Sequence, residues 1–501
     1  MKPAPHIAVV LASVAALLVT GCAPQSFELA GRTIDPKGEV TAVFPAAFRP
    51  EGRKWLAVTA AGGLTVYDAL GGSKPKAEVR LEPGTVFVGA ADVDGVPGDE
   101  LVAVSGGRVR YLKWRASGFA PHWVDLLEID TGFRGPVEKV VSPDFLRDID
   151  GDGTADLVLP ASTAGGAACV AVYRQAAPGR FAEFGRLAAG ARGSFASTAA
   201  NVGSETTYSY SVLMPHFIDT DGDGRREALL VVDDRLLVFR PRRDGTYPSK
   251  ADAEVRLVVG SEAPGVPPSV SVSSAQFAPL ARRRPGLALT DLGGRRALVF
   301  DLTDVGGSDR TSLDPAGAVA VAGFVLGSRF LDITGNGRAE LALVTVPPQG
   351  LLSVLRLYFS RSLDAYVRFY RSEGGWKEYQ ERRISYPLTI GADESGVAFG
   401  LPAVLNFRGD LTGDGVNDML MSVGPDRLAL YVGSKNGGFD SARASEVEVP
   451  SALNYRGIRN FAVDLDGDGR DEVVLTYLGW NPADNRVVVI GTTIEDAADE
   501  D

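Results

Sequence analysis

A chain of 501 residues is long enough for two or three ordinary domains, or for one large repeat architecture. Hydrophobic residues make up 45% of it and glycines number 59, which favours a folded, turn-rich protein over a disordered one. The net charge of −12 argues against nucleic acid as the main partner, and two cysteines are too few for a disulfide framework.

The N-terminus has the pattern of a targeting segment rather than of a folded domain. Lys2 supplies a positive end, residues 7–19 are almost wholly apolar, and Val19-Thr20-Gly21-Cys22 follows. This tetrapeptide resembles the lipobox of bacterial lipoproteins, whose cysteine is lipidated and becomes the first residue after cleavage. The resemblance implies a signal peptide over residues 1–21, lipidation of Cys22 and a tether over residues 22–26. An ordinary secretory signal or a short anchor is the alternative.

The lipid would be the only membrane anchor, because no later apolar run approaches the ~20 residues that a membrane span requires. In enteric lipoproteins an aspartate after the cysteine retains the protein at the inner membrane, and here that residue is Ala23. We therefore expect a lipid-anchored protein of the bacterial outer membrane, facing the periplasm or the cell surface. A tether of so few residues reaches roughly 14 Å, which would hold the folded body against the membrane.

Five later segments share one pattern of oxygen-bearing residues, which we number as slots one to nine. Three carry carboxylates at slots one, three, five and nine: Asp148, Asp150, Asp152 and Asp156; Asp219, Asp221, Asp223 and Glu227; Asp464, Asp466, Asp468 and Glu472. Two replace some acids by neutral oxygen ligands: Asp332, Thr334, Asn336 and Glu340; Asp410, Thr412, Asp414 and Asp418. Alternate acids on a tight turn can point at one hard cation, and the glycine at slot six allows the left-handed backbone of that turn.

Asp-x-Asp-x-Asp-Gly-x-x-Asp between strands resembles the FG-GAP, or VCBS, repeat of the integrin α-subunit propeller and of many bacterial surface proteins. The resemblance implies about five structural Ca²⁺ sites, to which slot seven adds its backbone carbonyl: Thr154, Arg225, Arg338, Val416 and Arg470. An EF-hand would need glutamate at slot twelve, where these segments carry leucine or methionine. An Asp-Gly turn without an ion is the alternative. A sixth, damaged copy at Asp92 has Val96 at slot five and Pro97 at slot six, and we expect an empty turn there.

The repeats predict the fold. Copies start near residues 46, 92, 148, 219, 279, 332, 410 and 464, and each offers about four short strands in 46 to 78 residues. That length matches a blade of a β-propeller better than a solenoid coil. We therefore predict one all-β propeller over residues 27–494, with eight four-stranded antiparallel blades, or seven as the alternative. The last copy is one strand short, so residues 27–33 would complete it and close the ring with strands from both termini. An acidic tail, 495–501, follows.

The copy that starts at residue 332 has room for an extra hairpin over residues 351–390, where aromatic and basic residues alternate. Aromatic and arginine side chains are enriched at binding hot spots, so this stretch is a candidate partner surface. Its candidate residues are Tyr366, Phe369, Tyr370, Trp376 and Tyr379. Packing of these rings between blades is the alternative.

Catalysis finds little support in the sequence. The three histidines, His6, His122 and His216, have no Gly-x-Ser-x-Gly elbow beside them, and neither a zinc spacing nor a phosphate-binding loop is present. The sequence favours a membrane-anchored, calcium-stabilised, monomeric module that binds an envelope protein or glycan without catalysis. The alternative is a polysaccharide-acting lyase or hydrolase, because some lyases resemble calcium-bearing propellers.

Overall fold

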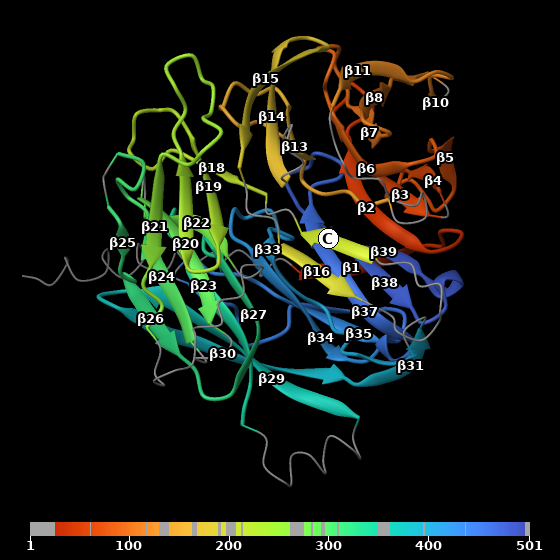
Figure 1. Cartoon of the computed structure of the whole chain (residues 1–501). Helices are drawn as coiled ribbons and strands as arrows, with labels where there is room; N and C mark the ends of the chain where they lie inside the picture. Colours follow the sequence, from red (N-terminus) through yellow and green to blue (C-terminus); the bar gives the residue numbers. More distant parts are fainter. Residues whose placement is uncertain are drawn as a thin grey trace, which may run out of the picture.

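The computed structural model describes residues 26–495, except 61, 117, 130–139, 163–167, 189–191, 197–206, 212–213, 261–274, 282–283, 292–295, 308–309, 349–360, 394–395 and 436. The predicted signal peptide, Cys22 and the tail beyond residue 495 lie outside this range. Eight sheets of the described strands are the blades of a propeller (Figure 1). Seven have four antiparallel strands, and one adds a short fifth strand to its four antiparallel strands. The prediction of an all-β, eight-bladed fold is confirmed. Within the described ranges, no helix is long and apolar enough to cross a membrane.

The blades follow the chain in order. Blade 1 is β2 (Val40–Ala46), β3 (Trp55–Ala60), β4 (Gly63–Tyr67) and β5 (Pro75–Arg80); blade 2 is β6 (Thr85–Ala91), β7 (Glu100–Ser105), β8 (Arg108–Leu112) and β11 (Val124–Glu128). Blade 3 is β12 (Leu146–Arg147), β13 (Asp156–Ser162), β14 (Ala168–Ala177) and β15 (Arg180–Leu187); blade 4 is β18 (His216–Ile218), β19 (Glu227–Val232), β20 (Arg235–Phe239) and β21 (Ala253–Leu257), with the short β25 (Ser312–Leu313) parallel to β21.

The second half repeats this order. Blade 5 is β22 (Gln276–Ala281), β23 (Arg284–Asp291), β24 (Arg296–Asp301) and β26 (Gly317–Ala320); blade 6 is β27 (Phe324–Leu331), β28 (Glu340–Val346), β29 (Ser362–Ser372) and β30 (Trp376–Pro387). Blade 7 is β33 (Leu405–Gly409), β34 (Asp418–Gly424), β35 (Arg427–Tyr431) and β36 (Ser445–Glu448); blade 8 is β37 (Tyr455–Val463), β38 (Glu472–Gly479), β39 (Arg486–Glu495) and β1 (Ser26–Ile34). Three further hairpins are β9 (Trp114–Arg115) with β10 (Gly118–Phe119), β16 (Arg192–Ala196) with β17 (Thr207–Ser211), and β31 (Thr389–Asp393) with β32 (Gly396–Gly400).

The ring closes through the N-terminal strand, as the sequence predicts. β1 pairs antiparallel with β39 along its whole length, from Ser26 opposite Glu495 to Ile34 opposite Val487. The backbone N–H of Leu29 also donates to Ser445 Oγ of blade 7 at 2.9 Å. The outermost strand of the last blade therefore comes from the start of the chain, so blade 8 cannot form without both ends of the domain.

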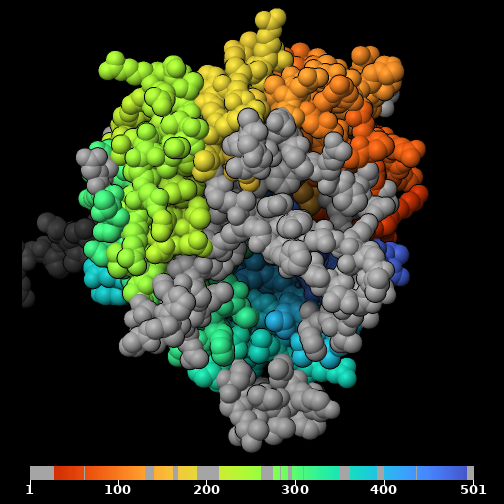
Figure 2. All heavy atoms as spheres, viewed as in Figure 1, coloured from red at the N-terminus to blue at the C-terminus, as the bar shows by residue number. Residues whose placement is uncertain are grey.

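The hydrophobic core is divided among the contacts between blades. The buried residues form eight clusters, and each joins two neighbouring blades, including blade 8 with blade 1. The second and third strands supply most of these residues because both faces of those strands are covered. Examples are Leu341 and Leu343 on β28 and Val474 and Leu475 on β38, all fully buried. The space-filling view has a hollow near the centre of the face shown, with blue and green atoms at its floor (Figure 2).

Candidate functional site

The five slot-pattern loops occupy one equivalent place in their blades. Each joins the first strand of a blade to the second, and slot nine is always the first residue of the second strand. These slot-nine residues are Asp156 on β13, Glu227 on β19, Glu340 on β28, Asp418 on β34 and Glu472 on β38. The loops therefore link the innermost strand of each blade to a fully buried neighbour.

Carboxylates build each turn by accepting backbone N–H groups. In blade 3, Asp148 accepts Gly151 N–H at 2.5 Å and Gly153 N–H at 3.0 Å, and both glycines have positive φ, near 85°. Asp156 accepts Ile149 N–H at 3.1 Å. The loops at Asp219, Asp410 and Asp464 repeat these slot-one and slot-nine bonds. The glycines at slots four and six are needed because a side chain would be strained there.

In the three acid-rich loops, the carboxylates of slots one, three and nine converge. Their oxygens lie within 4.8 Å of one another in Asp148, Asp150 and Asp156; in Asp219, Asp221 and Glu227; and in Asp464, Asp466 and Glu472. Slots one and three lie toward solvent, whereas slot nine is buried. Such a set of oxygen ligands suits a hard divalent cation.

The slot-five aspartates bind within the turn instead. Asp152, Asp223 and Asp468 each accept the slot-seven N–H, at 2.8 Å in all three cases. The side chains of Arg225 and Arg470 also pair with Asp223 and Asp468, donating from Nε at 2.8 Å. In these two loops slot seven, expected to supply only a carbonyl, thus adds a cation that neutralises slot five.

Two of the loops have neutral residues at slot three and make no group of three acids within the described residues. Thr334 Oγ1 donates to Glu340 at 3.1 Å. The Thr412 hydroxyl is buried without a hydrogen-bond partner. Asn336 accepts Arg338 N–H at 2.9 Å and Asp414 accepts Val416 N–H at 2.8 Å, as the slot-five aspartates do elsewhere. The Thr412 hydroxyl oxygen, at slot three, is therefore available as a ligand for a cation in this loop.

Burial raises the pKa of every slot-nine carboxyl. The shift takes Glu472 to about 7 and Asp418 to about 6, and it has the same direction and main cause in Asp156, Glu227 and Glu340. A buried carboxylate is costly unless a positive charge compensates it. The loops therefore concentrate negative charge where a cation would relieve it.

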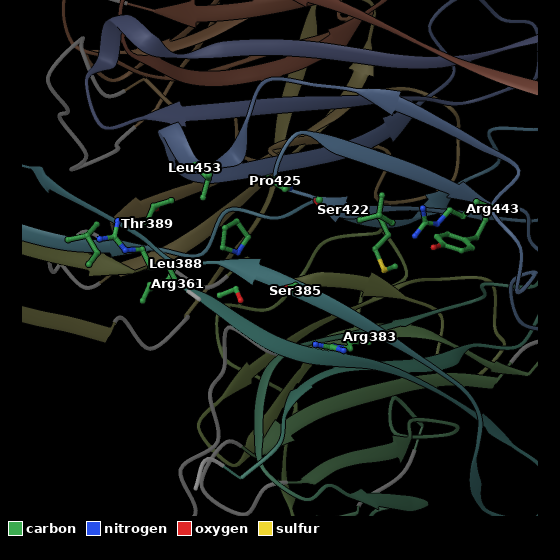
Figure 3. A pocket seen from close by; sticks show the side chains of 16 residues that line it. Arg361, Arg383, Ser385, Leu388, Thr389, Ser422, Pro425, Arg443 and Leu453 are labelled. Atoms are coloured by element: carbon green, nitrogen blue, oxygen red, sulfur yellow. The ribbon is translucent and has the colours of Figure 1, made fainter. Parts of the chain in front are cut away.

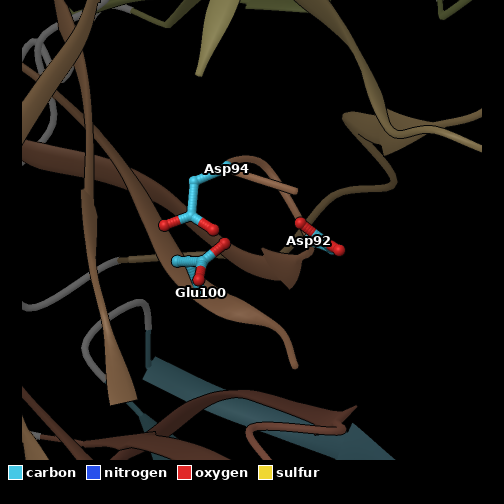
Figure 4. Close-up of side chains that lie close together, drawn as sticks. All are labelled: Asp92, Asp94 and Glu100. Atoms are coloured by element: carbon cyan, nitrogen blue, oxygen red, sulfur yellow. The ribbon is translucent and has the colours of Figure 1, made fainter. Parts of the chain in front are cut away.

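The damaged loop of blade 2 keeps the same convergence. Asp92, Asp94 and Glu100 lie close together (Figure 4), with their oxygens within 4.8 Å of one another, although slot five is the exposed Val96. Here the chain supplies its own cation, because Lys113 pairs with Asp94, and this bond raises the lysine pKa. Burial nevertheless raises the pKa of Glu100 to about 7.

The position of Lys113 recurs in other blades. Leu101 pairs with Leu112, so Lys113 lies opposite Glu100 across the sheet. The equivalent residue is Arg174 in blade 3, where it pairs with Asp150, and Arg371 in blade 6. In blades 7 and 8 the position holds Val432 and Gly491. The loops at Asp410 and Asp464 therefore face no such basic side chain.

The structure corrects the candidate partner surface. Phe369 and Tyr370 on β29 are 0% and 6% exposed. Phe369 packs against Phe407 and Phe439, and Tyr379 joins the same cluster between blades 6 and 7. Trp376 and Tyr370 belong to the cluster between blades 5 and 6, and Tyr366 is half-buried. Four of the five rings therefore pack between blade 6 and its neighbours, which is the alternative that the sequence left open, whereas Tyr366 belongs to neither cluster.

A groove does lie beside them, between blades 6 and 7 (Figure 3). Its volume is about 910 Å³. Its lining includes Arg361, Arg383, Arg443, Ser385, Ile390 and Leu453, and none of its residues is acidic. Ile390 and Leu453 are 58% and 51% exposed and give the groove apolar surface. We call this feature the blade 6–7 groove.

Comparison with known proteins supports the repeat. Residues 410–475 match the model of the FG-GAP-like repeat. No curated protein sequence matches the chain. Among solved structures, Saccharomyces cerevisiae Sqt1 is similar at 10% identity and a TM-score of 0.46, with 92% of this chain and 97% of that one covered. BBS1N, in its complex with ARL6DN, is similar at 8% identity and TM-score 0.37, with 94% and 98% covered. An Agrocybe aegerita lectin is similar at 13% identity and TM-score 0.36, with 94% and 96% covered. At these TM-scores the likenesses carry no argument.

Proposed function

We propose, for a propeller that contains an FG-GAP-like repeat, that the chain is a non-catalytic binding or scaffold module of the bacterial cell envelope. The observation that carries the proposal is the convergence of acidic side chains in turns that connect the inner strands of a closed ring. Such turns make the ring rigid and leave its surfaces free for a partner.

Calcium is the cation that these loops would hold. The carboxylates of slots one, three and nine would bind it in blades 3, 4 and 8, together with the slot-seven carbonyl, and in blade 3 the ion would replace Arg174 beside Asp150. In blades 6 and 7 the neutral oxygens of Thr334 and Thr412 would replace one carboxylate each, and the orphaned Thr412 hydroxyl supports this. All donors are hard oxygens, as calcium prefers, and neutralising the buried slot-nine charge would stabilise the blade.

A lipid on Cys22 would anchor the module. β1 begins at Ser26, so only three residues would separate the lipidated cysteine from the strand that closes the ring. The edge of blade 8 would then face the membrane. Cys22→Ser should move the protein from the membrane fraction to the soluble fraction and abolish incorporation of labelled fatty acid. Membrane retention of this variant would contradict the anchor.

The blade 6–7 groove is the surface that we assign to an envelope protein or glycan. Its exposed aliphatic residues provide apolar area, and its arginines provide guanidinium donors, two of which also pair with Asp364 and Glu446. The test is capture of partners from an envelope extract by the purified protein, with and without calcium. Ile390→Asp combined with Leu453→Asp should abolish capture. Val124→Asp on β11 is the matched control, because Val124 is 41% exposed on blade 2 and should tolerate the change.

If the double variant still captures the partner, the partner binds at another surface of the protein. The same extract would then be tested for polysaccharide turnover, and clearing of a polysaccharide by the pure protein would contradict a non-catalytic role.

A further inference from the structure

The axis of the propeller carries a charge opposite to that of the whole protein. The first strands of neighbouring blades contact each other around it, as β2 does with β6, β22 with β27 and β33 with β37. None of the eight first strands contains aspartate or glutamate, although the chain has 63 acidic residues. They contain five arginines instead: Arg147, Arg329, Arg408, Arg456 and Arg459. Arg147 and Arg456 pair with Asp144 and Glu39. The remaining three make the inner wall basic in a protein whose net charge is −12.

Three of these arginines meet in one cavity. A space of about 670 Å³ is lined by β27, β33 and β37, and Arg329, Arg408 and Arg459 project from these strands. A smaller space of about 210 Å³ shares Arg459, Asn460 and Phe461 with it and reaches Thr41 on β2. No carboxylate lines either space. We call the two together the axial cavity.

The three arginines of the axial cavity have no carboxylate partner among the described residues. Among the described residues, none of the three forms an ion pair, and Arg329 donates only to the carbonyl of its neighbour Ser328, at 3.0 Å. All three arginines are exposed residues, and desolvation by the surrounding protein, followed by the positive charge of Arg408, lowers the pKa of Arg329. Arginines on the outer strands are different, because Arg235 pairs with Glu254 and Arg383 with Asp364. Cations that converge without a partner repel one another unless an anion binds.

We propose that the axial cavity binds a small organic anion with two or more carboxylate or phosphate groups. Guanidinium groups bind both oxyanions through paired hydrogen bonds, and three of them exceed what one monoanion needs. The side-chain amides of Asn406 and Asn460, bonded to each other at 3.0 Å, add polar groups to the wall. Phe461 and Ile458 add apolar surface. A space of about 670 Å³ is within the range that small-molecule ligands occupy.

The test is isothermal titration of the purified full chain with succinate and with glycerol 2-phosphate, using succinamide as the uncharged control. At least one anion should bind, succinamide should not, and the affinity should fall as salt is added. Succinate alone would identify a carboxylate ligand, and glycerol 2-phosphate alone a phosphate ligand. Arg408→Gln and Arg459→Gln should each weaken binding about tenfold, because each removes a charge-assisted hydrogen bond.

Arg235→Gln is the matched control, since it removes the same charge from the outer surface and should leave binding unchanged. Melting temperatures would show whether each variant folds. If one of the two axial-cavity variants does not fold, the other provides the test. Absence of binding by wild-type protein would overturn the proposal. Equal affinity for wild type and for both axial-cavity variants would also overturn it, because the anion would then bind elsewhere. This inference does not depend on calcium in the loops or on the blade 6–7 groove.

Discussion

Replacing Glu472 by glutamine should change stability with opposite sign in the absence and presence of calcium. Glu472 is 7% exposed and accepts the Leu465 N–H at 2.8 Å. Its oxygens converge with those of Asp464 and Asp466. Burial, and beyond it the charges of Asp466, Asp468 and Asp464, raise its pKa to about 7. In metal-free protein this carboxylate is therefore a destabilising buried charge.

The size of the effect follows from the shift in pKa. A folded-state pKa of about 7 against the ordinary 4.5 corresponds to about 3 kcal/mol at pH 8. The folded state binds the proton more tightly than the unfolded state, so the penalty is absent below pH 4.5 and grows until about pH 7. Glutamine carries no charge and keeps an oxygen for Leu465. Glu472→Gln should thus stabilise the metal-free protein at pH 8 by at most about 3 kcal/mol.

Calcium reverses the sign because the substitution also removes a ligand. The assay is urea unfolding at pH 5 and pH 8, in EDTA and in excess calcium. Glu448→Gln on β36 is the control, because it removes the same charge from an exposed side chain. The variant should exceed wild type in EDTA at pH 8, match it more closely at pH 5, and fall below it in calcium. Equal destabilisation with and without calcium would refute the reasoning.

Three other predictions concern the blades themselves. Lys113→Met should lower stability by about 1 kcal/mol, because it leaves the charges beside Asp94 without their cation; the loss should be the same in EDTA and in calcium, measured by urea unfolding. Phe369→Ala should cost about 3–5 kcal/mol by leaving a cavity between blades 6 and 7, and an unchanged melting temperature would contradict that packing. Deleting residues 26–34 should expose the edge of β39 and cause self-association in size-exclusion chromatography, whereas a stable monomer would show that β1 is dispensable.

The repeated loops made the fold predictable from sequence. Each slot pattern lies at the start of a second strand, so the spacing of aspartates such as Asp148 and Asp219 reports the spacing of blades. Blades 1 and 5 lack the slot pattern, and they were recognisable because their strands kept the same hydrophobic runs as those of the other blades. The missing strand of the last copy predicted closure by β1, since an unpaired edge strand is unfavourable.

Sequence could not identify the side chains that meet across strands. Lys113 lies opposite Glu100 only because of the register of β7 with β8, which no local pattern encodes. Phe369 and Trp376 alternate with charged residues, and the same alternation suits an exposed hairpin or one packed between two blades. The arginines of the axial cavity are far apart in sequence, and their convergence depends on which strand of each blade is innermost.

The central claim is that calcium in the slot loops holds the ring together, and thermal melting of the purified chain tests it most directly. We predict that excess EDTA lowers the melting temperature and that added calcium, but not the same concentration of sodium, restores it. We also predict that native mass spectrometry of the restored protein finds about five bound calcium ions, with none lost in Lys113→Met. A melting temperature that is identical in EDTA and in calcium would contradict the claim.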